Sequence, residues 1–216
     1  MLTKAFTFNP VGENTYLIWD EETKEAAIID AGMSNNRENE AVNEVVTGES
    51  LQLKYALQTH MHFDHIWGLS YIKEKYGLRP LCHADDEVIY SQAPEMTSMF
   101  RLSMNWNIPA IERFLVEGET LLLGKTAIKV LHTPGHTPGG LSFYIESAHT
   151  LFTGDTLFRG SVGRTDLPGG NLTDEINSIK NKILTLPADT VIYSGHGPES
   201  TVEWEWKHNP FIWSRE

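Results

Sequence analysis

The alternation of hydrophobic and polar residues predicts a chain of short strands and amphipathic helices. Apolar runs bounded by Gly, Pro or charged residues predict strands, and apolar positions at helical spacing predict helices. The predicted strands cover residues 2–8, 14–19, 26–29, 51–57, 81–84, 119–123, 126–131, 141–145, 150–152 and 190–193. The predicted helices cover residues 37–47, 66–76, 85–92 and 173–184. The first three strands are expected to pair antiparallel, and the whole pattern is typical of an α/β protein.

Residues at the ends of two predicted helices support their boundaries. Asn36 is the expected N-cap of the first helix, because a short polar side chain can accept a free N–H of the first turn. Gly77 is expected to end the second helix, because glycine adopts the left-handed conformation of a C-terminal cap.

One long stretch of the sequence shows no clear periodicity. Residues 93–109 are rich in methionine and aromatic side chains and carry a proline near each end. They form either a flap that makes one wall of a substrate site or a loop packed on the core. The sequence leaves the role of this stretch open.

Composition narrows the class of protein. The chain has 216 residues, 40% of them hydrophobic, which is enough for one large domain or two small ones. The net charge of −12 disfavours a nucleic-acid partner, because such proteins usually present a basic face. A single cysteine, Cys82, excludes an internal disulfide and fits a reducing compartment. The sequence shows neither a secretory signal nor the roughly 20 apolar residues of a membrane span, so we expect a cytoplasmic enzyme without a membrane partner.

Candidate metal ligands cluster directly after the strand predicted at residues 51–57. His60, His62, Asp64 and His65 all lie within six residues. Buried imidazole and carboxylate groups cost free energy unless they are paired or bind a metal, so this density indicates a prepared site. His60 and His62 are spaced at i and i+2, the period of a strand, whereas helical zinc-protease ligands are spaced at i and i+4.

Three further ligand-type residues follow later strands. His136, Asp155 and His196 each lie in a loop that contains glycine, at the end of a predicted strand. Loops at strand ends can meet at one edge of a sheet, so we expect all seven side chains to converge. Five imidazoles and two carboxylates suit two borderline cations such as zinc, iron or manganese.

The order of these motifs resembles the metallo-β-lactamase superfamily, and most closely its short glyoxalase II-like branch. The resemblance rests on His-X-His-X-Asp-His at 60–65, Thr-Pro-Gly-His-Thr at 133–137, Gly-Asp-Thr at 154–156 and Gly-His at 195–196. It implies an α/β fold, a four-layer αββα sandwich with the metal site at the sheet edge. It also implies a single domain over residues 1–216, without the separate C-terminal glutathione-binding domain of full-length glyoxalase II.

The resemblance also implies two divalent metal ions, with zinc expected and iron or manganese as alternatives. It places His60, His62 and His136 on one ion. It places Asp64, His65 and His196 on the other ion, and it makes Asp155 the bridge between the two ions. It makes Asp64 and Asp155 the expected catalytic residues.

Asp30 matches an Asp-X-Gly position of the superfamily. It is expected either to hydrogen-bond a ligand imidazole or to cap its own turn. The remaining histidines match no motif position and are expected at the surface or behind the ligands: His83, His132, His149 and His208.

The function implied by the resemblance is hydrolysis of a thioester, such as a hydroxyacylglutathione, by a metal-bridging hydroxide. The alternative is an oxidoreductase resembling persulfide dioxygenases, with one iron held by His60, His136 and Asp155. The ligands for both arrangements are present, so the sequence does not separate them. Lactamases proper match less well, because they are exported and usually lack the bridging Asp.

Arg164, in the glycine-rich loop at 160–170, is the expected substrate-binding residue. A guanidinium can hold a substrate carboxylate through two charge-assisted hydrogen bonds. Alternatively, Arg164 pairs with Asp166 or with a backbone carbonyl and so shapes the loop, and the sequence supports this interpretation about equally. We expect a small-molecule substrate and leave homo-oligomer formation open.

Overall fold

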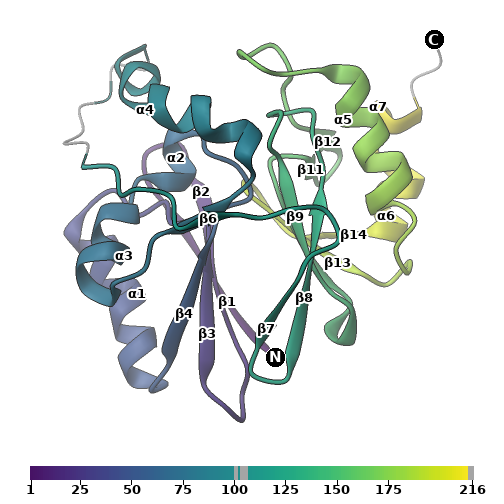
Figure 1. Cartoon of the computed structure of the whole chain (residues 1–216). Coiled ribbons are helices and arrows are strands. Elements are labelled where there is room, and N and C mark those ends of the chain that lie inside the picture. Colours follow the sequence, from purple (N-terminus) through teal and green to yellow (C-terminus); the bar gives the residue numbers. More distant parts are fainter. Residues whose placement is uncertain (100–101, 103–106, 214–216) are drawn as a thin grey trace.

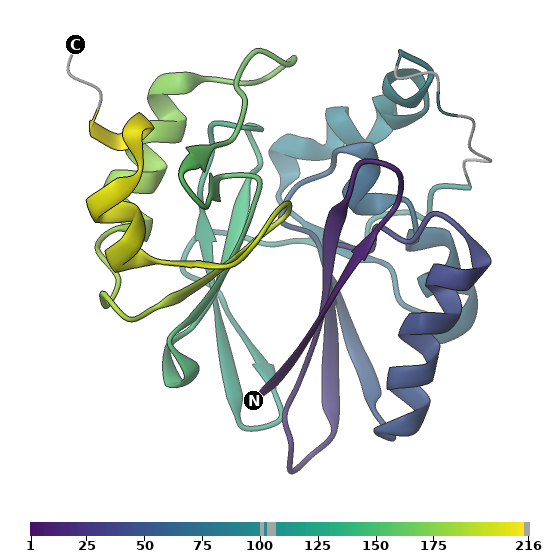
Figure 2. The same ribbon diagram turned by 180° about the vertical axis from the view of Figure 1, so that it is seen from behind.

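Two six-stranded β-sheets pack face to face, and helices cover the outer face of each sheet (Figure 1). The view from behind shows the same order of layers, αββα (Figure 2). This computed structural model describes residues 1–99, 102 and 107–213. The four-layer sandwich predicted from the sequence is confirmed.

The first sheet comes from the N-terminal half of the chain. Its strands, in spatial order, are β1 (Leu2–Phe8), β2 (Glu13–Trp19), β3 (Glu25–Ile29), β4 (Gln52–Leu57), β5 (Pro80–Cys82) and β6 (Arg113–Phe114). The first three strands pair antiparallel, as predicted, and the remaining pairs are parallel. Parallel neighbours need a crossover connection, which α1 (Asn36–Gly48) supplies between β3 and β4.

The second sheet comes from the C-terminal half. Its strands, in spatial order, are β14 (Ser200–Thr201), β13 (Val191–Ser194), β10 (Thr150–Gly154), β9 (Leu141–Ile145), β8 (Thr126–His132) and β7 (Thr120–Leu123). β11 (Leu157–Phe158) and β12 (Ser161–Val162) form a separate small hairpin.

Helices complete the two outer layers. The first sheet is covered by α1 and by α2 (Phe63–Ile66), α3 (Leu69–Tyr76), the short 3₁₀ turn η1 (Ala84–Asp86) and α4 (Glu87–Met99). The second sheet is covered by α5 (Leu172–Ser178), its π-helical continuation η3 (Ile179–Ile183), α6 (Val202–His208) and α7 (Pro210–Trp213). The 3₁₀ turn η2 (Glu146–Ala148) links β9 to β10.

Strand alternation explains why the sheets are buried on both faces. Successive side chains of a strand point to opposite faces. In β2, Tyr16 and Ile18 pack between the two sheets, whereas Leu17 and Trp19 belong to the core under the helices. A strand segment covered on both sides must be apolar on both faces, which is why residues 16–19 lack a polar face.

Two predicted helix boundaries can be compared with the structure. α1 begins one residue earlier than predicted, because the side chain of Asn35, and not that of Asn36, accepts the Glu38 N–H at 3.1 Å. Gly77 ends α3 in the left-handed conformation, as predicted, and its N–H donates to the Lys73 carbonyl.

The prediction of an irregular stretch at 93–109 is wrong for its first part. α4 continues through Pro94 to Met99, although proline removes one helical hydrogen bond. Ala93 and Thr97 are buried, and the Thr97 hydroxyl donates to the Ala93 carbonyl at 2.7 Å, so packing and local bonding maintain the helix. Phe100, Met104 and Trp106, which belong to the same Met-rich stretch, lie outside the described residues.

The shortest elements were not predicted. β6, β11, β12 and β14 have two residues each, too short for hydrophobic periodicity to show. α6 and α7 were not predicted either, because they have only seven and four residues.

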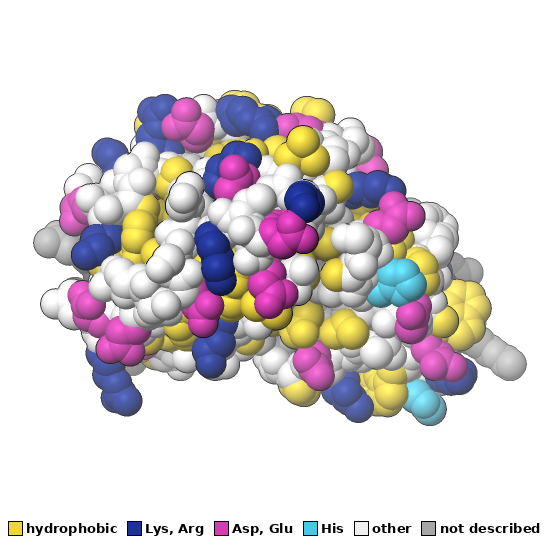
Figure 3. All heavy atoms as spheres, turned by 90° about the horizontal axis from the view of Figure 1, so that it is seen from below, with side chains coloured by type: hydrophobic (Ala, Val, Ile, Leu, Met, Phe, Trp, Pro, Cys, Tyr) yellow, Lys and Arg dark blue, Asp and Glu magenta, His cyan; other side chains and the backbone are white. Residues whose placement is uncertain are grey.

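The end of the molecule that carries the strand turns presents a mixed surface. Basic and acidic side chains are interspersed on this face (Figure 3). Exposed ion pairs of opposite charge also occur, such as Lys129 with Glu146 at 2.6 Å. Across the described part of the chain, we find no helix with the length and apolar character of a membrane span.

Candidate metal centre

The seven predicted ligands come from four segments, each of which follows the C-terminal end of a strand, and Asp64 and His65 lie in the short helix α2 within the first segment. The segments follow β4, β8, β10 and β13, and their His and Asp side chains approach one another at the same edge of the two sheets. The two sheets therefore contribute to one cluster from opposite sides, as Figure 1 shows for their strand ends.

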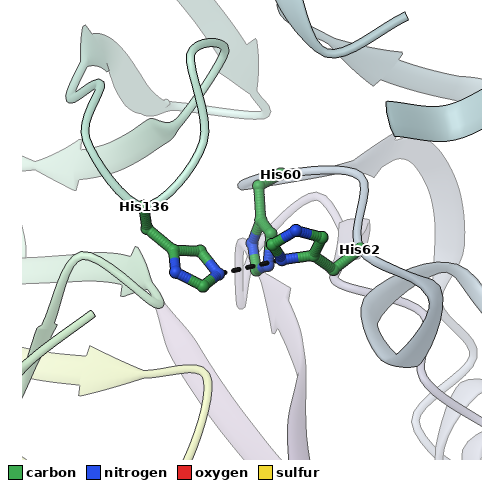
Figure 4. Close-up of side chains that lie close together, drawn as sticks. All are labelled: His60, His62 and His136. Atoms are coloured by element: carbon green, nitrogen blue, oxygen red, sulfur yellow. Dashed lines mark hydrogen bonds between the residues drawn. The ribbon is translucent and has the colours of Figure 1, made fainter. Parts of the chain in front are cut away.

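One group of the cluster consists of His60, His62 and His136, and Figure 4 shows their rings pointing toward a common centre. Their ligand atoms lie within 4.8 Å of one another. His62 Nδ1 and His136 Nε2 are 2.9 Å apart. Three buried imidazoles in this arrangement match the donor set of a zinc-type site.

The loop after β4 keeps the alternation of a strand, which separates its side chains. Met61 is completely buried in the core beneath the helices, whereas its neighbours His60 and His62 turn to the cluster. The spacing of i and i+2 therefore places both imidazoles on one side of the chain.

The other group consists of Asp64, His65 and His196. His196 Nε2 lies 3.2 Å from Asp64 Oδ2, and His65 Nε2 lies 3.7 Å from the same oxygen. Asp64 belongs to the single turn of α2, whose N-terminal end favours a carboxylate.

Asp155 lies between the two groups. Its Oδ1 is 3.4 Å from His65 Nε2, and its Oδ2 is 3.6 Å from both His136 Nε2 and His196 Nε2. One carboxylate thus approaches imidazoles of both groups, with a separate oxygen turned toward His65.

Hydrogen bonds behind the cluster orient the imidazoles. A carbonyl or carboxylate oxygen can only accept, so His136 Nδ1 donates to the Arg164 carbonyl at 2.8 Å, and His196 Nδ1 donates to the Gly12 carbonyl at 3.2 Å. His60 Nδ1 contacts the Thr59 hydroxyl at 3.1 Å. In each case the other ring nitrogen, Nε2, is directed to the cluster, which is the arrangement of metal-binding histidines.

Asp30 bonds a candidate ligand, which is the first of the two roles considered from the sequence. Its Oδ2 accepts from His65 Nδ1 at 3.0 Å and from the Thr59 hydroxyl at 2.7 Å, and its Oδ1 accepts the Thr59 N–H at 2.8 Å. Asp30 therefore orients His65 and also fastens the start of the ligand loop.

The protonation state of the three-histidine group favours cation binding. Burial, with the fields of neighbouring imidazoles, holds the pKa of His60 well below its usual range and lowers that of His62 to about 3. Burial opposes ionisation of Asp155, yet the fields of His65 and other imidazoles keep its pKa well below the usual range. Neutral imidazoles and ionised carboxylates are the forms that bind a metal. In the other group burial opposes the charged imidazoles, yet the neighbouring carboxylates Asp64 and Asp155 raise the pKa of His65 and of His196.

Three buried atoms of the cluster show whether its residues suit a bound cation. His60 Nε2, His65 Nε2 and Asp155 Oδ1 make no hydrogen bond within the described part of the chain. Such atoms are costly when buried unless they have a partner. Because all three are lone-pair donors turned to the cluster, the residues fit a bound cation.

A pocket of about 180 Å³ opens beside the cluster. Its floor includes His62, Asp64, His136, Asp155 and His196. Its walls carry the apolar side chains of Val11, Phe63, Met96 and Leu167 and the side chain of Arg164. Met96 comes from α4, so one residue of the Met-rich stretch does line the pocket.

Arg164 contacts both the pocket and its own loop. Its Nε and one terminal nitrogen bind the two carboxylate oxygens of Asp166 at 2.7 and 2.8 Å, the loop-shaping contact considered from the sequence. The side chain is half exposed at the pocket rim, and its backbone carbonyl holds His136. Whether the guanidinium also binds substrate stays a prediction.

Glu175 was missed from the sequence. This fully buried residue of α5 accepts the His136 N–H at 2.8 Å and the Gly163 N–H at 3.1 Å, so it joins the His136 loop to the Arg164 loop. A Cβ on Gly163 would lie 2.0 Å from the Asp155 carbonyl oxygen and 2.6 Å from the Glu175 carboxylate, which explains the glycine. The sequence does contain a feature that could have identified Glu175. This charged residue is at helical spacing with Ile179 and Ile183, on the buried face of α5 and η3.

The histidines left out of the ligand set lie away from the cluster. His149 is exposed and pairs with Asp189 at 2.8 Å, and His208 is exposed. His83 and His132 stack on each other behind the His136 loop.

Known proteins are similar to this chain in sequence and in fold. The model of the metallo-beta-lactamase superfamily matches residues 8–196. Hydroxyacylglutathione hydrolase GloC of Haemophilus influenzae is 38% identical to this chain over 210 residues, 94% of each protein.

Two solved structures superpose with a TM-score of 0.85. BLEG-1 B3 metallo-beta-lactamase is 34% identical and is matched over 99% of this chain and 100% of that chain. TTHA1623 in a di-iron-bound form is 36% identical and is matched over 96% of this chain and 99% of that chain. Four segments that follow strand ends bring five histidines and two aspartates together at one edge of the two sheets, and this chain belongs to the metallo-β-lactamase superfamily.

Proposed function

We propose that this metallo-hydrolase superfamily member hydrolyses a thioester of the hydroxyacylglutathione type. We further propose that His60, His62 and His136 hold one divalent cation, that Asp64, His65 and His196 hold a second, and that Asp155 contacts both. Zinc is the proposed metal, and iron or manganese are the alternatives. Two cations held there would lower the pKa of a bound water and polarise the thioester carbonyl.

The observation that carries this proposal is the position of Asp155. Its two oxygens lie within 3.6 Å of imidazoles from both groups, so the groups are adjacent and share a carboxylate. Adjacent sites of this kind are typical of hydrolases that use two metals.

The chain's own residues supply what a hydrolase needs besides metal. The apolar walls formed by Phe63, Met96 and Leu167 limit water around a bound substrate. Arg164 at the rim carries a positive charge that suits a carboxylate at the far end of the substrate. A thiolate is a good leaving group, so the reaction makes little demand on a general acid, and no nucleophilic Ser or Cys is required.

The comparisons support the substrate class without deciding it. GloC is named a hydroxyacylglutathione hydrolase, and its likeness covers 94% of both chains. BLEG-1 is named a B3 metallo-beta-lactamase, so a β-lactam belongs in the substrate panel. The di-iron form of TTHA1623 makes iron a metal to test beside zinc.

The test is hydrolysis of S-lactoylglutathione by the protein loaded with zinc, iron or manganese, compared with the Asp155→Ala and His62→Ala variants. We expect each variant to lose more than about 100-fold in kcat/KM, because even changes behind the ligands typically cost 10- to 100-fold. His149→Ala is the matched control, since this histidine is exposed and pairs with Asp189 on the surface. Full activity of metal-free Asp155→Ala would refute the proposal.

Metal content separates the alternative arrangement. Two cations per chain and release of thiol support the hydrolase. One iron per chain, with oxygen uptake on a persulfide and no thioester hydrolysis, would instead support the dioxygenase reaction. His62→Ala adds a second contrast, because only the two-cation arrangement uses His62.

A further inference from the structure

Asp86 is a completely buried carboxylate that joins the two loops carrying the histidine group. Its Oδ2 accepts the Met61 N–H at 3.1 Å, between His60 and His62. The same oxygen accepts the Thr137 hydroxyl at 2.9 Å, next to His136. Its Oδ1 accepts the Gly139 N–H at 2.6 Å. One side chain of η1 therefore links the His60–His62 segment to the His136 loop, although it ligates nothing itself.

The surroundings of Asp86 are built to hold this carboxylate. A Cβ on Gly139 would lie 2.6 Å from Asp86 Oδ1, so only glycine lets the loop approach so closely. Three donors converge on a group that burial makes costly to ionise, and burial raises the pKa of Asp86 to about 6. Burying this carboxyl group costs free energy, and all of its hydrogen bonds go to donors of the two histidine loops. We therefore infer that it holds these loops in place.

A second contact fastens the same turn to the same loop. The rings of His83 and His132 stack with centroids 4.1 Å apart and planes at 11°, and His132 Nε2 donates to the Pro138 carbonyl at 2.9 Å. These two rings and Asp85 place ligand-type atoms within 4.8 Å of one another. An imidazole binds a cation in the plane of its ring, and two parallel stacked rings have no common in-plane point. The stack therefore serves as packing between η1 and the His136 loop, not as a second cation site.

We propose that Asp86 is a positioning residue, which sets the separation between the His60–His62 segment and the His136 loop and thereby the affinity of the three-histidine group for its cation. This inference rests on the ligand assignment of the proposed function. It adds a residue that touches neither cation nor substrate.

Asp86→Asn tests the inference with almost no change in volume. All three partners of Asp86 are donors, and asparagine offers one acceptor oxygen and one NH₂ group. In either orientation the NH₂ faces a backbone N–H, that of Met61 or that of Gly139, so one link between the loops is lost. We expect cobalt binding 10- to 100-fold weaker than in the wild type, measured by competition with a chelator, and a changed visible spectrum of the cobalt-loaded protein.

Asp20→Asn is the matched control for the loss of a buried aspartate. Asp20 is buried and accepts the Glu22, Thr23 and Lys125 N–H groups. Glu13, the first of the seven residues of β2, bridges to His196 of the cluster, and Asp20 directly follows the last residue of this strand. The length of the strand therefore places Asp20 roughly 20 Å from the cluster. We expect Asp20→Asn to lower the unfolding midpoint while cobalt affinity and spectrum stay as in the wild type.

Thr137→Val is the milder variant, because it removes a single bond to Asp86 and preserves shape. If Asp86→Asn does not fold, weaker cobalt binding by folded Thr137→Val supports the inference, and unchanged binding overturns it. If Asp86→Asn folds and matches the wild type in cobalt affinity and spectrum, Asp86 is only structural and the inference is wrong. A wild type that binds no cation would refute the ligand assignment itself, and the inference would fall with it.

Discussion

Replacing Asp30 by asparagine removes a charge but almost no volume, in the shell behind His65. The carboxylate accepts three hydrogen bonds, from His65 Nδ1, the Thr59 hydroxyl and the Thr59 N–H, at 2.7 to 3.0 Å. Asparagine can serve these donors in two orientations, and each has a different cost. The variant therefore separates the contribution of Asp30 to folding from its contribution to cation binding.

In one orientation the amide oxygen of the new asparagine would replace Oδ2 and keep His65 in place, while its NH₂ group faces the Thr59 N–H. A buried donor left without an acceptor costs about 1–3 kcal/mol of unfolding free energy. In the other orientation the NH₂ group faces His65 Nδ1. His65 must then accept at Nδ1 and carry its proton on Nε2, the atom that is turned to Asp155, so this proton must be displaced before His65 can bind a cation. We expect a 10- to 100-fold loss of affinity in that case, about 1.4–2.8 kcal/mol.

Two measurements on Asp30→Asn distinguish these outcomes: urea unfolding of the metal-free protein, and zinc affinity by competition with a chelator. Asp189→Asn is the matched control, because Asp189 makes the same kind of bond to His149 on the surface. That control should change the unfolding free energy by less than about 0.5 kcal/mol and zinc affinity not at all. Asp30→Asn with unchanged stability and unchanged zinc affinity would refute the role assigned to Asp30.

Two further predictions concern regions away from the metal centre. Hydrogen bonds, first from the Thr23 N–H, lower the pKa of Asp20 to about 2, so its contribution to stability is present above pH 3.8 and is lost as pH falls toward 2. Urea midpoints of wild type and Asp20→Asn should differ at pH 6 and converge near pH 2, and a gap independent of pH would contradict this. Phe143→Ala, in the completely buried core between the sheets, should cost about 3–5 kcal/mol in urea unfolding, whereas Leu122→Ala, on an exposed strand position, should cost about 0.5 or less. Equal losses in the two variants would contradict the assigned core.

Local patterns were sufficient for most of the fold and for the proposed ligands. Hydrophobic periodicity located the long strands and α1, because burial on one or both faces determines which positions must be apolar. The spacing of His60 and His62 indicated two imidazoles on one side of an extended segment, and Met61 between them is indeed buried. The motif order supplied Asp64, His65, His136, Asp155 and His196 as candidates. It also supplied Asp30, either as the partner of an imidazole or as the cap of its own turn.

Local patterns failed where packing over long sequence distances decides the structure. α4 continues through Pro94 because its buried face packs on the first sheet, a gain that propensity does not contain. Gly77 alone predicted the end of α3. Strands of two residues, such as β6, exist only because a neighbouring strand pairs with them.

The sequence by itself determined the α/β class and the set of side chains able to bind cations, because residue type and spacing carry that information. The four layers were implied by the resemblance of its motifs to a known superfamily. Only the tertiary structure decided how those side chains are held. Asp86 contacts Met61 and Gly139, and Glu175 contacts His136 and Gly163, across separations of 12 to 53 residues. Each of these carboxylates is an ordinary charged residue in the sequence, and its partners are backbone N–H groups, which every residue other than proline possesses. Their role arises from burial and from the distance between loops, and both are properties of the folded chain.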